Sequence, residues 1–168
     1  MSEAKSLILN QSQVDQKITR MAYQIYENNL SEKEIVFAGI WDKGYQFASI
    51  LKERVDSVSS INSTLVKVNL DKNSPTQTEI LIDLPVDQLK NKVIVLVDDV
   101  LNSGRTLAYS LKPFLDIKIK KLETAVLVNR DHTSFPLSAT YNGHSLSTTI
   151  QEHVEVVIDG ENLEVYLY

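Results

Sequence analysis

The sequence predicts an α/β fold, in which a central and mostly parallel sheet is flanked by helices and carries a small β-rich appendage. Three observations predict it. Segments with helical periodicity alternate with buried-strand patterns along most of the chain. One strand pattern, Val93–Val97, is a continuous run rich in β-branched residues, which is typical of a central parallel strand covered on both faces. The C-terminal part alternates between apolar and polar residues and holds two short strand patterns.

The first half of the chain alternates between helix and strand patterns. Apolar residues at helical spacing predict a helix over about Ser12–Asn28, with Ser12 as its N-cap. The apolar run Ile35–Ile40 predicts a buried strand, and a second helix is expected over about Tyr45–Val55. Thr64–Leu70 alternates as a strand does. Asp71–Thr78 is polar and contains a proline, so a loop is expected there.

The second half continues the alternation and then becomes rich in strands. A helix is expected over about Gly104–Leu111, and Pro113 is expected to end or kink it. Leu122–Val128 predicts another buried strand. The last two strands are expected to be antiparallel and joined at Asp159-Gly160, and they are Val154–Ile158 and Leu163–Tyr168.

The composition excludes several classes of protein. The 168 residues are expected to form one domain, 1–168, with room for a hydrophobic core. The net charge of −5 argues against a surface that binds nucleic acid as a whole and leaves a local basic patch open. The absence of cysteine excludes disulfide scaffolds, thiolate metal sites and cysteine nucleophiles. Because no apolar run approaches the roughly 20 residues of a membrane span or resembles a secretion signal, a cytoplasmic protein is expected.

The residues suited to chemistry are concentrated in one segment, Val93–Thr106. An apolar strand delivers two adjacent carboxylates, Asp98 and Asp99, at the edge where open α/β sheets bind ligands. A loop then opens a helix whose first N–H groups are free to bind an anion, and Gly104 lets the backbone approach that anion closely. Because carboxylates accept hydrogen bonds from vicinal hydroxyls, the segment predicts a site for a phosphorylated sugar with Mg²⁺. The competing interpretation is two solvated aspartates followed by an ordinary capped helix.

This segment resembles the phosphoribosyl-pyrophosphate (PRPP) signature of type I phosphoribosyltransferases: an apolar strand, two acids, two apolar residues, then x-Ser/Thr-Gly-x-Thr. The resemblance implies that family's fold, with a small hood formed by the N-terminal segment and about residues 129–168. It implies that Asp98 and Asp99 are catalytic residues that hold the ribose hydroxyls and help to hold the Mg²⁺ that binds with PRPP. The residues implied to bind the 5′-phosphate are Asn102, Ser103, Gly104, Arg105 and Thr106.

A second turn stands where this family places its diphosphate loop. It consists of Trp41, Asp42, Lys43 and Gly44. A strand-to-helix turn with exposed N–H groups and one lysine can bind a leaving diphosphate, and Lys43 is implied to act in catalysis there. The alternative is a plain turn between a strand and a helix.

Several stretches extend the resemblance over nearly the whole chain to one branch of the family, the pyrimidine-operon attenuation regulators that also act as uracil phosphoribosyltransferases. That branch implies conversion of uracil and PRPP to UMP and diphosphate, a homodimer or higher homo-oligomer, and an RNA-binding face that includes Thr19 and Arg20. The stretches are Ile18–Ala22, Gly39-Ile40 with Lys43-Gly44, Val95–Thr106, Ala125–Arg130 and Tyr141–Gly143.

The chain departs from that branch at three places. The flexible loop has Asp71–Ser74 where the branch carries a Tyr-Arg-Asp-Asp type of run, so Lys72 replaces an arginine without its bidentate geometry. On the RNA-binding helix, Tyr23 replaces a histidine and Asn28 replaces an arginine, which is expected to weaken phosphate contacts. The residues implied to form the base pocket also differ in part from the branch, and they are Asn129, Arg130, His132, Ser147 and Thr148.

Two functions follow from these observations. The first is an enzyme that transfers the 5-phosphoribosyl group from PRPP to a nucleobase, with uracil as the expected base. The second is a non-catalytic or weakly catalytic sensor of PRPP or nucleotide that regulates pyrimidine genes through RNA. The changed flexible loop motivates the second, and the intact phosphate loop argues against a chain that binds no ligand. A degenerate relative that binds no ligand is the third and least favoured possibility.

Overall fold

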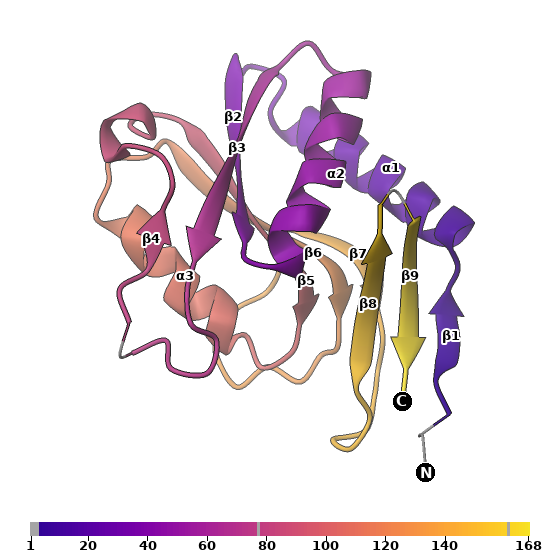
Figure 1. The fold of residues 1–168 in the computed structure, drawn as a ribbon. Coiled ribbons are helices and arrows are strands. Elements are labelled where there is room, and N and C mark those ends of the chain that lie inside the picture. The colour runs from indigo at the N-terminus through magenta and orange to yellow at the C-terminus, as the bar shows by residue number, and fades with distance from the viewer. Residues whose placement is uncertain (1–3, 77, 161) are drawn as a thin grey trace.

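The computed structural model describes residues 4–76, 78–160 and 162–168, which form two sheets flanked by helices (Figure 1). Gln77 of the predicted loop and residues 1–3 of the predicted hood lie outside the described residues. The helices are α1 (Gln11–Asn28), α2 (Lys43–Val58) and α3 (Arg105–Leu115), with a 3₁₀ turn at Val86–Gln88. The strands are β1 (Ser6–Leu9), β2 (Glu34–Ile40), β3 (Asn62–Asn69), β4 (Leu81–Ile82), β5 (Val93–Leu101), β6 (Lys121–Asn129), β7 (Tyr141–Ser145), β8 (Val154–Asp159) and β9 (Asn162–Leu167).

The larger sheet has the strand order β4-β3-β2-β5-β6-β7. It is parallel throughout except for β4, which pairs antiparallel with β3. The apolar run Val93–Val97 lies in β5, between β2 and β6, and its residues are fully buried. Helices α1 and α2 cover one face of the sheet and α3 covers the other (Figure 1). The predicted α/β fold with a mostly parallel sheet is confirmed.

Successive side chains of β5 enter two different cores because they alternate between the faces of the sheet. Val95 packs with Phe47 in the core under α1 and α2. Its neighbour Leu96 packs with Phe114 in the core under α3. Both faces of this strand are therefore buried, which explains why its sequence is a continuous apolar run rather than an alternating one.

The smaller sheet, which we call the hood, has the order β1-β9-β8 and is antiparallel. It stands beside the central sheet, and β1 lies next to the last strand of the chain (Figure 1). Tyr141–Ser145 does not belong to it, because β7 pairs in parallel with β6 in the central sheet. The C-terminal strands of the hood therefore begin at Val154 rather than near residue 129.

Helix α1 begins at Gln11, so the prediction of Ser12 as its N-cap is wrong. The side-chain oxygen of Asn10 accepts a hydrogen bond from the Gln13 N–H, 2.9 Å away. The Gln13 side-chain oxygen accepts one in return from the Asn10 N–H, also at 2.9 Å. This reciprocal capping box satisfies two backbone donors and fixes the start of the helix one residue before Ser12.

Helix α3 continues to Leu115, beyond the predicted end near Leu111. Pro113 lies in its last turn, where its missing N–H removes only one intrahelical hydrogen bond. Phe114, directly after the proline, is fully buried, and its packing keeps that turn in place. Among the described residues, no helix combines the length and apolar character that crossing a membrane requires.

A buried polar cluster lies at the end of the sheet where β6 and β7 begin. Tyr141 and Glu123 are 2% and 5% exposed, and the tyrosine hydroxyl donates a hydrogen bond to the carboxylate. The Asn28 side chain, at the end of α1, donates to the same hydroxyl at 3.1 Å. Lys121 lies 2.9 Å from the other Glu123 oxygen. The cluster attaches the end of α1 to the central sheet.

We predict that Tyr141→Phe destabilises the protein by about 1 to 3 kcal/mol, because one oxygen of the buried Glu123 carboxylate loses its hydroxyl donor. Urea unfolding would measure the free-energy change. Tyr166→Phe is the matched control: that hydroxyl also donates to a glutamate, Glu164, but the pair is only half-buried, so a change within about 0.5 kcal/mol is expected. Equal effects of the two substitutions would contradict the importance of the buried cluster.

Candidate functional site

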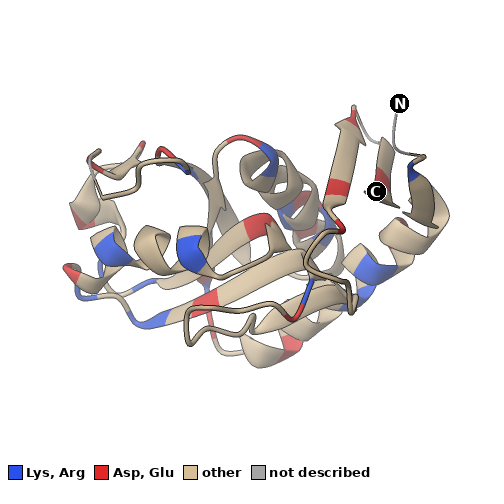
Figure 2. Cartoon of the chain, turned by 90° about the horizontal axis from the view of Figure 1, so that it is seen from below, with Lys and Arg blue, Asp and Glu red and all other residues tan. Residues whose placement is uncertain are grey.

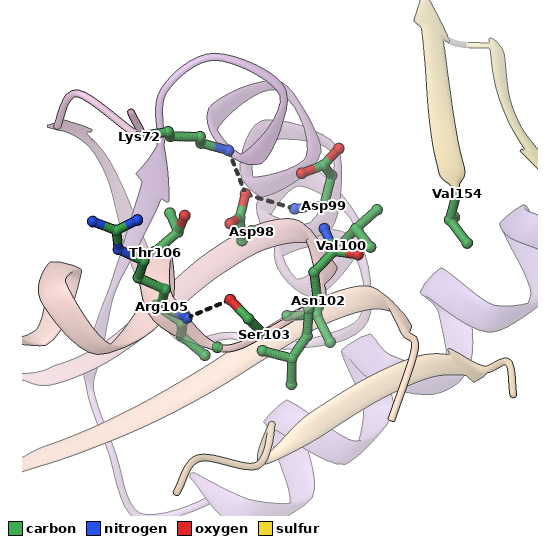
Figure 3. A pocket seen from close by; sticks show the side chains of 13 residues that line it. Lys72, Asp98, Asp99, Val100, Asn102, Ser103, Arg105, Thr106 and Val154 are labelled. Atoms are coloured by element: carbon green, nitrogen blue, oxygen red, sulfur yellow. Dashed lines mark hydrogen bonds and ion pairs between the residues drawn. The ribbon is translucent and has the colours of Figure 1, made fainter. Parts of the chain in front are cut away.

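A cavity of about 240 Å³ opens at the carboxyl end of β5. Every residue of the run 98–107 lines it, together with Lys72 from the loop after β3, Val126 from β6 and Val154 from the hood (Figure 3). The predicted ribose residues and the predicted phosphate loop therefore share one cavity. The sequence pattern did not identify Val126 or Val154, since an apolar strand residue carries no signal that it faces a ligand.

Asp98 and Asp99 lie inside β5 and not after it, because β5 continues to pair with β6 as far as Leu101. Asp98 is only 4% exposed, and its carboxylate accepts a hydrogen bond from the Asp99 N–H at 3.0 Å. Lys72 lies 3.5 Å from the same oxygen. Burial, and then the neighbouring Asp99 charge, raise the pKa of Asp98 to about 8, while the Lys72 charge opposes the shift. Burial therefore favours the protonated form of Asp98.

The predicted phosphate loop is the turn that joins β5 to α3. Gly104 is its N-cap residue and has a φ of +83°, a left-handed conformation that favours glycine. The Ser103 hydroxyl accepts a hydrogen bond from the Arg105 N–H at 3.3 Å. The Ser103 carbonyl accepts two more, from the N–H groups of Ser134 and Phe135. These hydrogen bonds fix the loop, and Arg105 and Thr106, the first residues of α3, line the cavity. The first N–H groups of a helix have no partner within the helix, so this end of α3 can bind an anion.

The turn Trp41–Gly44 lies against the back of this site. The peptide bond between Trp41 and Asp42 is cis. A Cβ atom on Gly44 would lie 2.8 Å from an Asp98 carboxylate oxygen, so only glycine lets the start of α2 approach the buried carboxyl group this closely. The Lys43 ammonium donates a hydrogen bond to the Val156 carbonyl of β8 at 2.8 Å and does not line the cavity. Its role at a diphosphate remains a prediction.

The five residues predicted for the base pocket have different environments. Arg130 is 8% exposed and donates hydrogen bonds to Thr148 and Asn102, at 3.0 Å each. Asn129 is paired with Asp131. His132 is exposed and its ring nitrogen contacts the Thr148 carbonyl, while Ser147 is exposed. None of the five lines the cavity, which the hood reaches through Val154 instead.

The two residues predicted for an RNA face both form contacts within the chain. Arg20 donates hydrogen bonds to the carbonyls of Asn142 and Gly143 in β7, at 3.1 and 2.7 Å. The Thr19 hydroxyl donates to the Asp15 carbonyl at 2.9 Å. Acidic and basic residues are interspersed over the elements seen in Figure 2. Arg20 therefore connects α1 to β7 of the central sheet.

The carboxylates at the cavity can bind Mg²⁺ only together with further ligands from substrate or water. Among the described residues, no three histidine, aspartate or glutamate side chains come together as a metal cage. Two adjacent carboxylates, Asp98 and Asp99, do line the cavity. Mg²⁺ commonly binds one or two carboxylates and completes its coordination with substrate phosphates and water. The residues present fit that mode, in which the metal arrives with a phosphorylated substrate.

We predict that the free protein loses stability as the pH rises from about 4 to about 8. The unfolded aspartate titrates near pH 4, whereas folded Asp98 keeps its proton up to about pH 8, so the stabilisation is present at low pH and lost in between. Urea midpoints measured across this range should show the decline, and Asp98→Asn should remove it. Asp116→Asn, at an exposed position, should leave the decline unchanged. If Asp98→Asn shows the same decline, the pH dependence of stability does not come from Asp98.

Comparison with known proteins identifies the family that the sequence motifs resemble. The family described as phosphoribosyl transferase domain matches residues 6–159. The bifunctional protein PyrR of Bacillus pumilus is 30% identical over 94% of this chain and 92% of that protein. The bifunctional protein PyrR of Bacillus subtilis is 32% identical, with 92% and 91% covered.

Solved structures with lower sequence identity share the fold. A hypoxanthine-guanine phosphoribosyltransferase from Bacillus anthracis superposes with a TM-score of 0.75 at 19% identity, over 96% of this chain and 98% of the other. A Trypanosoma cruzi hypoxanthine phosphoribosyl transferase gives 0.78 at 13% identity, over 98% and 92%. The fold is that of type I phosphoribosyltransferases, as the sequence predicts. On its sequence, its fold and its cavity together, this chain belongs to the phosphoribosyltransferase family.

Proposed function

We propose that this protein transfers the 5-phosphoribosyl group from PRPP to a ring nitrogen of uracil, forming UMP and diphosphate in the presence of Mg²⁺. One observation carries the proposal: two adjacent carboxylates and an anion-binding helix start line the same cavity. A phosphorylated ribose needs both of these features, a pair of acceptors for its vicinal hydroxyls and a cradle of donors for its phosphate.

Each end of a ribose 5-phosphate has its own set of donors or acceptors in this cavity. Asp98 and Asp99 would accept hydrogen bonds from the 2′- and 3′-hydroxyls. The N–H groups at the start of α3 would bind the 5′-phosphate, with the hydroxyls of Ser103 and Thr106 and the Arg105 guanidinium beside them. Because these groups are held by β5 and by the first turn of α3, the ribose is positioned before any reaction begins.

The reaction requires stabilisation of charge rather than a covalent nucleophile. The bond from C1′ to the diphosphate oxygen breaks with its electron pair going to diphosphate, the bond from the base nitrogen to C1′ forms, and the nitrogen's proton passes to solvent. An oxocarbenium-like ribose is positive, so Asp98 and Asp99 would stabilise it once Asp98 is ionised. Lys72, which already lines the cavity, would stabilise the diphosphate. Bound Mg²⁺ would neutralise further negative charge on that leaving group.

The choice of uracil rests on similarity alone. The relatives with about 30% identity carry the name bifunctional protein PyrR. The solved hypoxanthine-guanine phosphoribosyltransferases are less than 25% identical and support the fold only. Uracil is therefore the first base to test, and hypoxanthine and guanine belong in the same panel.

A pyrophosphate-release assay with PRPP, Mg²⁺ and each free base in turn would test the proposal. Release with uracil, but not with adenine, is the expected result. Release with hypoxanthine alone would overturn the choice of uracil but would still support phosphoribosyl transfer. No release with any base would overturn the catalytic proposal.

A regulator that senses PRPP or nucleotide is the second candidate. The observation in its favour is the loop around Lys72, in which a lysine replaces the arginine expected of the family branch. Tight binding of UMP without turnover on any base would support it. Under either candidate function, we propose that the protein is a homo-oligomer in the cytoplasm. Under the second, RNA would be a partner.

We predict that Asp99→Asn lowers kcat about 100-fold or more, because the variant removes one of the two negative charges facing the ribose. Steady-state rates of pyrophosphate release would measure the loss, and an unchanged melting temperature would show that the fold is intact. Asp87→Asn is the control, since Asp87 is an exposed partner of Lys90. Equal activity of Asp99→Asn and the wild type would show that the site is placed wrongly.

We predict that Lys72→Ala raises the KM for PRPP about 5- to 10-fold, because the cavity loses the cation nearest to Asp98. Lys72→Arg should restore most of the affinity, since it restores the charge. Initial rates at varied PRPP would measure both variants. If Lys72→Ala changes only the KM for the base, Lys72 does not face the diphosphate.

A further inference from the structure

Arg130 is a buried cation that the proposed reaction does not use. It lies at the end of β6 and is 8% exposed. Its guanidinium contacts no carboxylate among the described residues; its partners are an amide, a hydroxyl and two backbone carbonyls. A buried arginine satisfied wholly by neutral acceptors is costly to place, so its geometry calls for an explanation.

The hydrogen bonds of Arg130 join two loops that are distant in sequence. One Nη donates to the side-chain oxygen of Asn102, in the phosphate loop, at 3.0 Å. Nε donates to the Thr148 hydroxyl at 3.0 Å, and the other Nη donates to the carbonyls of Thr149 and Glu152, just before β8. The guanidinium therefore fixes the phosphate loop relative to the segment that enters the hood.

These bonds also decide which way the Asn102 amide faces. Arginine has donors and no acceptor, so the amide must turn its oxygen toward Arg130 and its NH₂ group away. Within the described part of the chain, that NH₂ group donates to no protein acceptor. Asn102 lines the cavity, and Figure 3 shows its amide nitrogen on the side toward Asp99. Two N–H bonds are thus available to a ligand.

The position of Asn102 indicates which part of the ligand it meets. Figure 3 shows Asn102 and Asp99 on the side of the cavity toward the hood residue Val154, whereas Thr106 lies on the other side. With the ribose on Asp98 and Asp99 and the phosphate on Ser103–Thr106, the base extends away from the phosphate, toward the hood, so Asn102 is assigned here to the base and not to the 5′-phosphate. Asn102 and Val154 lie on that side.

We infer that Arg130 is a positioning residue, which holds the Asn102 amide so that its NH₂ group donates a hydrogen bond to a carbonyl oxygen of the bound base. This inference rests on the proposed function and adds a specificity device to it. The site takes a base with an exocyclic carbonyl, because an oriented donor pairs with a carbonyl and leaves an exocyclic amino group unpaired. Without Arg130 the amide is free to rotate and offers either end.

Binding measurements separate this inference from catalysis. Calorimetry gives the dissociation constants of UMP and of ribose 5-phosphate, and their ratio reports what the base contributes. The wild type is expected to prefer UMP. Asn102→Ala and Arg130→Lys should each reduce that preference about 5- to 10-fold, the loss of one hydrogen bond. The double variant should lose no more than either single variant, because both act through one donor.

Controls distinguish a positioning role from a merely structural one. Thr149→Val keeps the backbone carbonyl that Arg130 uses, so it should retain the wild-type ratio. Additive losses in the double variant, or a wild-type ratio in Asn102→Ala, would overturn the inference. If Arg130→Lys does not fold, Thr148→Val replaces it, because that variant removes the acceptor of the Arg130 Nε.

These experiments distinguish failure of the inference about Arg130 and Asn102 from failure of the proposed enzyme function. If no base is turned over but the preference for UMP still depends on Asn102, the enzyme proposal fails and the inference stands. If turnover occurs but the wild type binds UMP no more tightly than ribose 5-phosphate, the inference fails and the enzyme proposal stands.

Discussion

The burial of Asp98 inside the central strand β5 is the constraint on which the rest of the site depends. Its carboxyl group is held between the Asp99 N–H, the Lys72 ammonium and the backbone at Gly44. A carboxyl group in that position exists only because β5 is covered on both faces and continues to pair with β6 beyond Val97. The start of α2 approaches it because position 44 has no side chain. The turn that precedes α2 and the strand that carries the aspartates are therefore one packed unit.

Much of this unit could be predicted from the sequence because the responsible forces act locally. A continuous apolar run identifies β5, and two acids followed by Ser103-Gly104 indicate a strand that ends at an anion-binding helix start. The helix ends were less predictable, since capping by Asn10 competes with capping by Ser12 and only the reciprocal bond to Gln13 decides. Strand β7 was missed for a physical reason. A Cβ on Gly143 would lie 2.5 Å from the Leu127 carbonyl, so this strand requires a residue without a side chain there, and its apolar signal is weak.

The partners of the charged residues could not be predicted, because they come from distant parts of the chain. Lys43 donates to Val156, Arg20 donates to β7, and Arg130 donates to both Asn102 and the hood loop. A sequence pattern reports that a residue is cationic and near a motif. It does not report which acceptors elsewhere in the chain already occupy its donors; for Lys43 and Arg20 these are backbone carbonyls more than one hundred residues away.

These partners imply that a bound substrate changes the electrostatics of the site. Lys72 lies beside Asp98, Lys43 is bonded to the hood, and burial favours the protonated form of Asp98. A bound diphosphate offers Lys72 a stronger partner than a protonated carboxyl group does. Ribose hydroxyls and a divalent cation favour the ionised form of Asp98, because they donate to it or neutralise it. Substrate binding should therefore release a proton from Asp98, and the same step converts a buried neutral group into the negative charge that an oxocarbenium-like ribose requires.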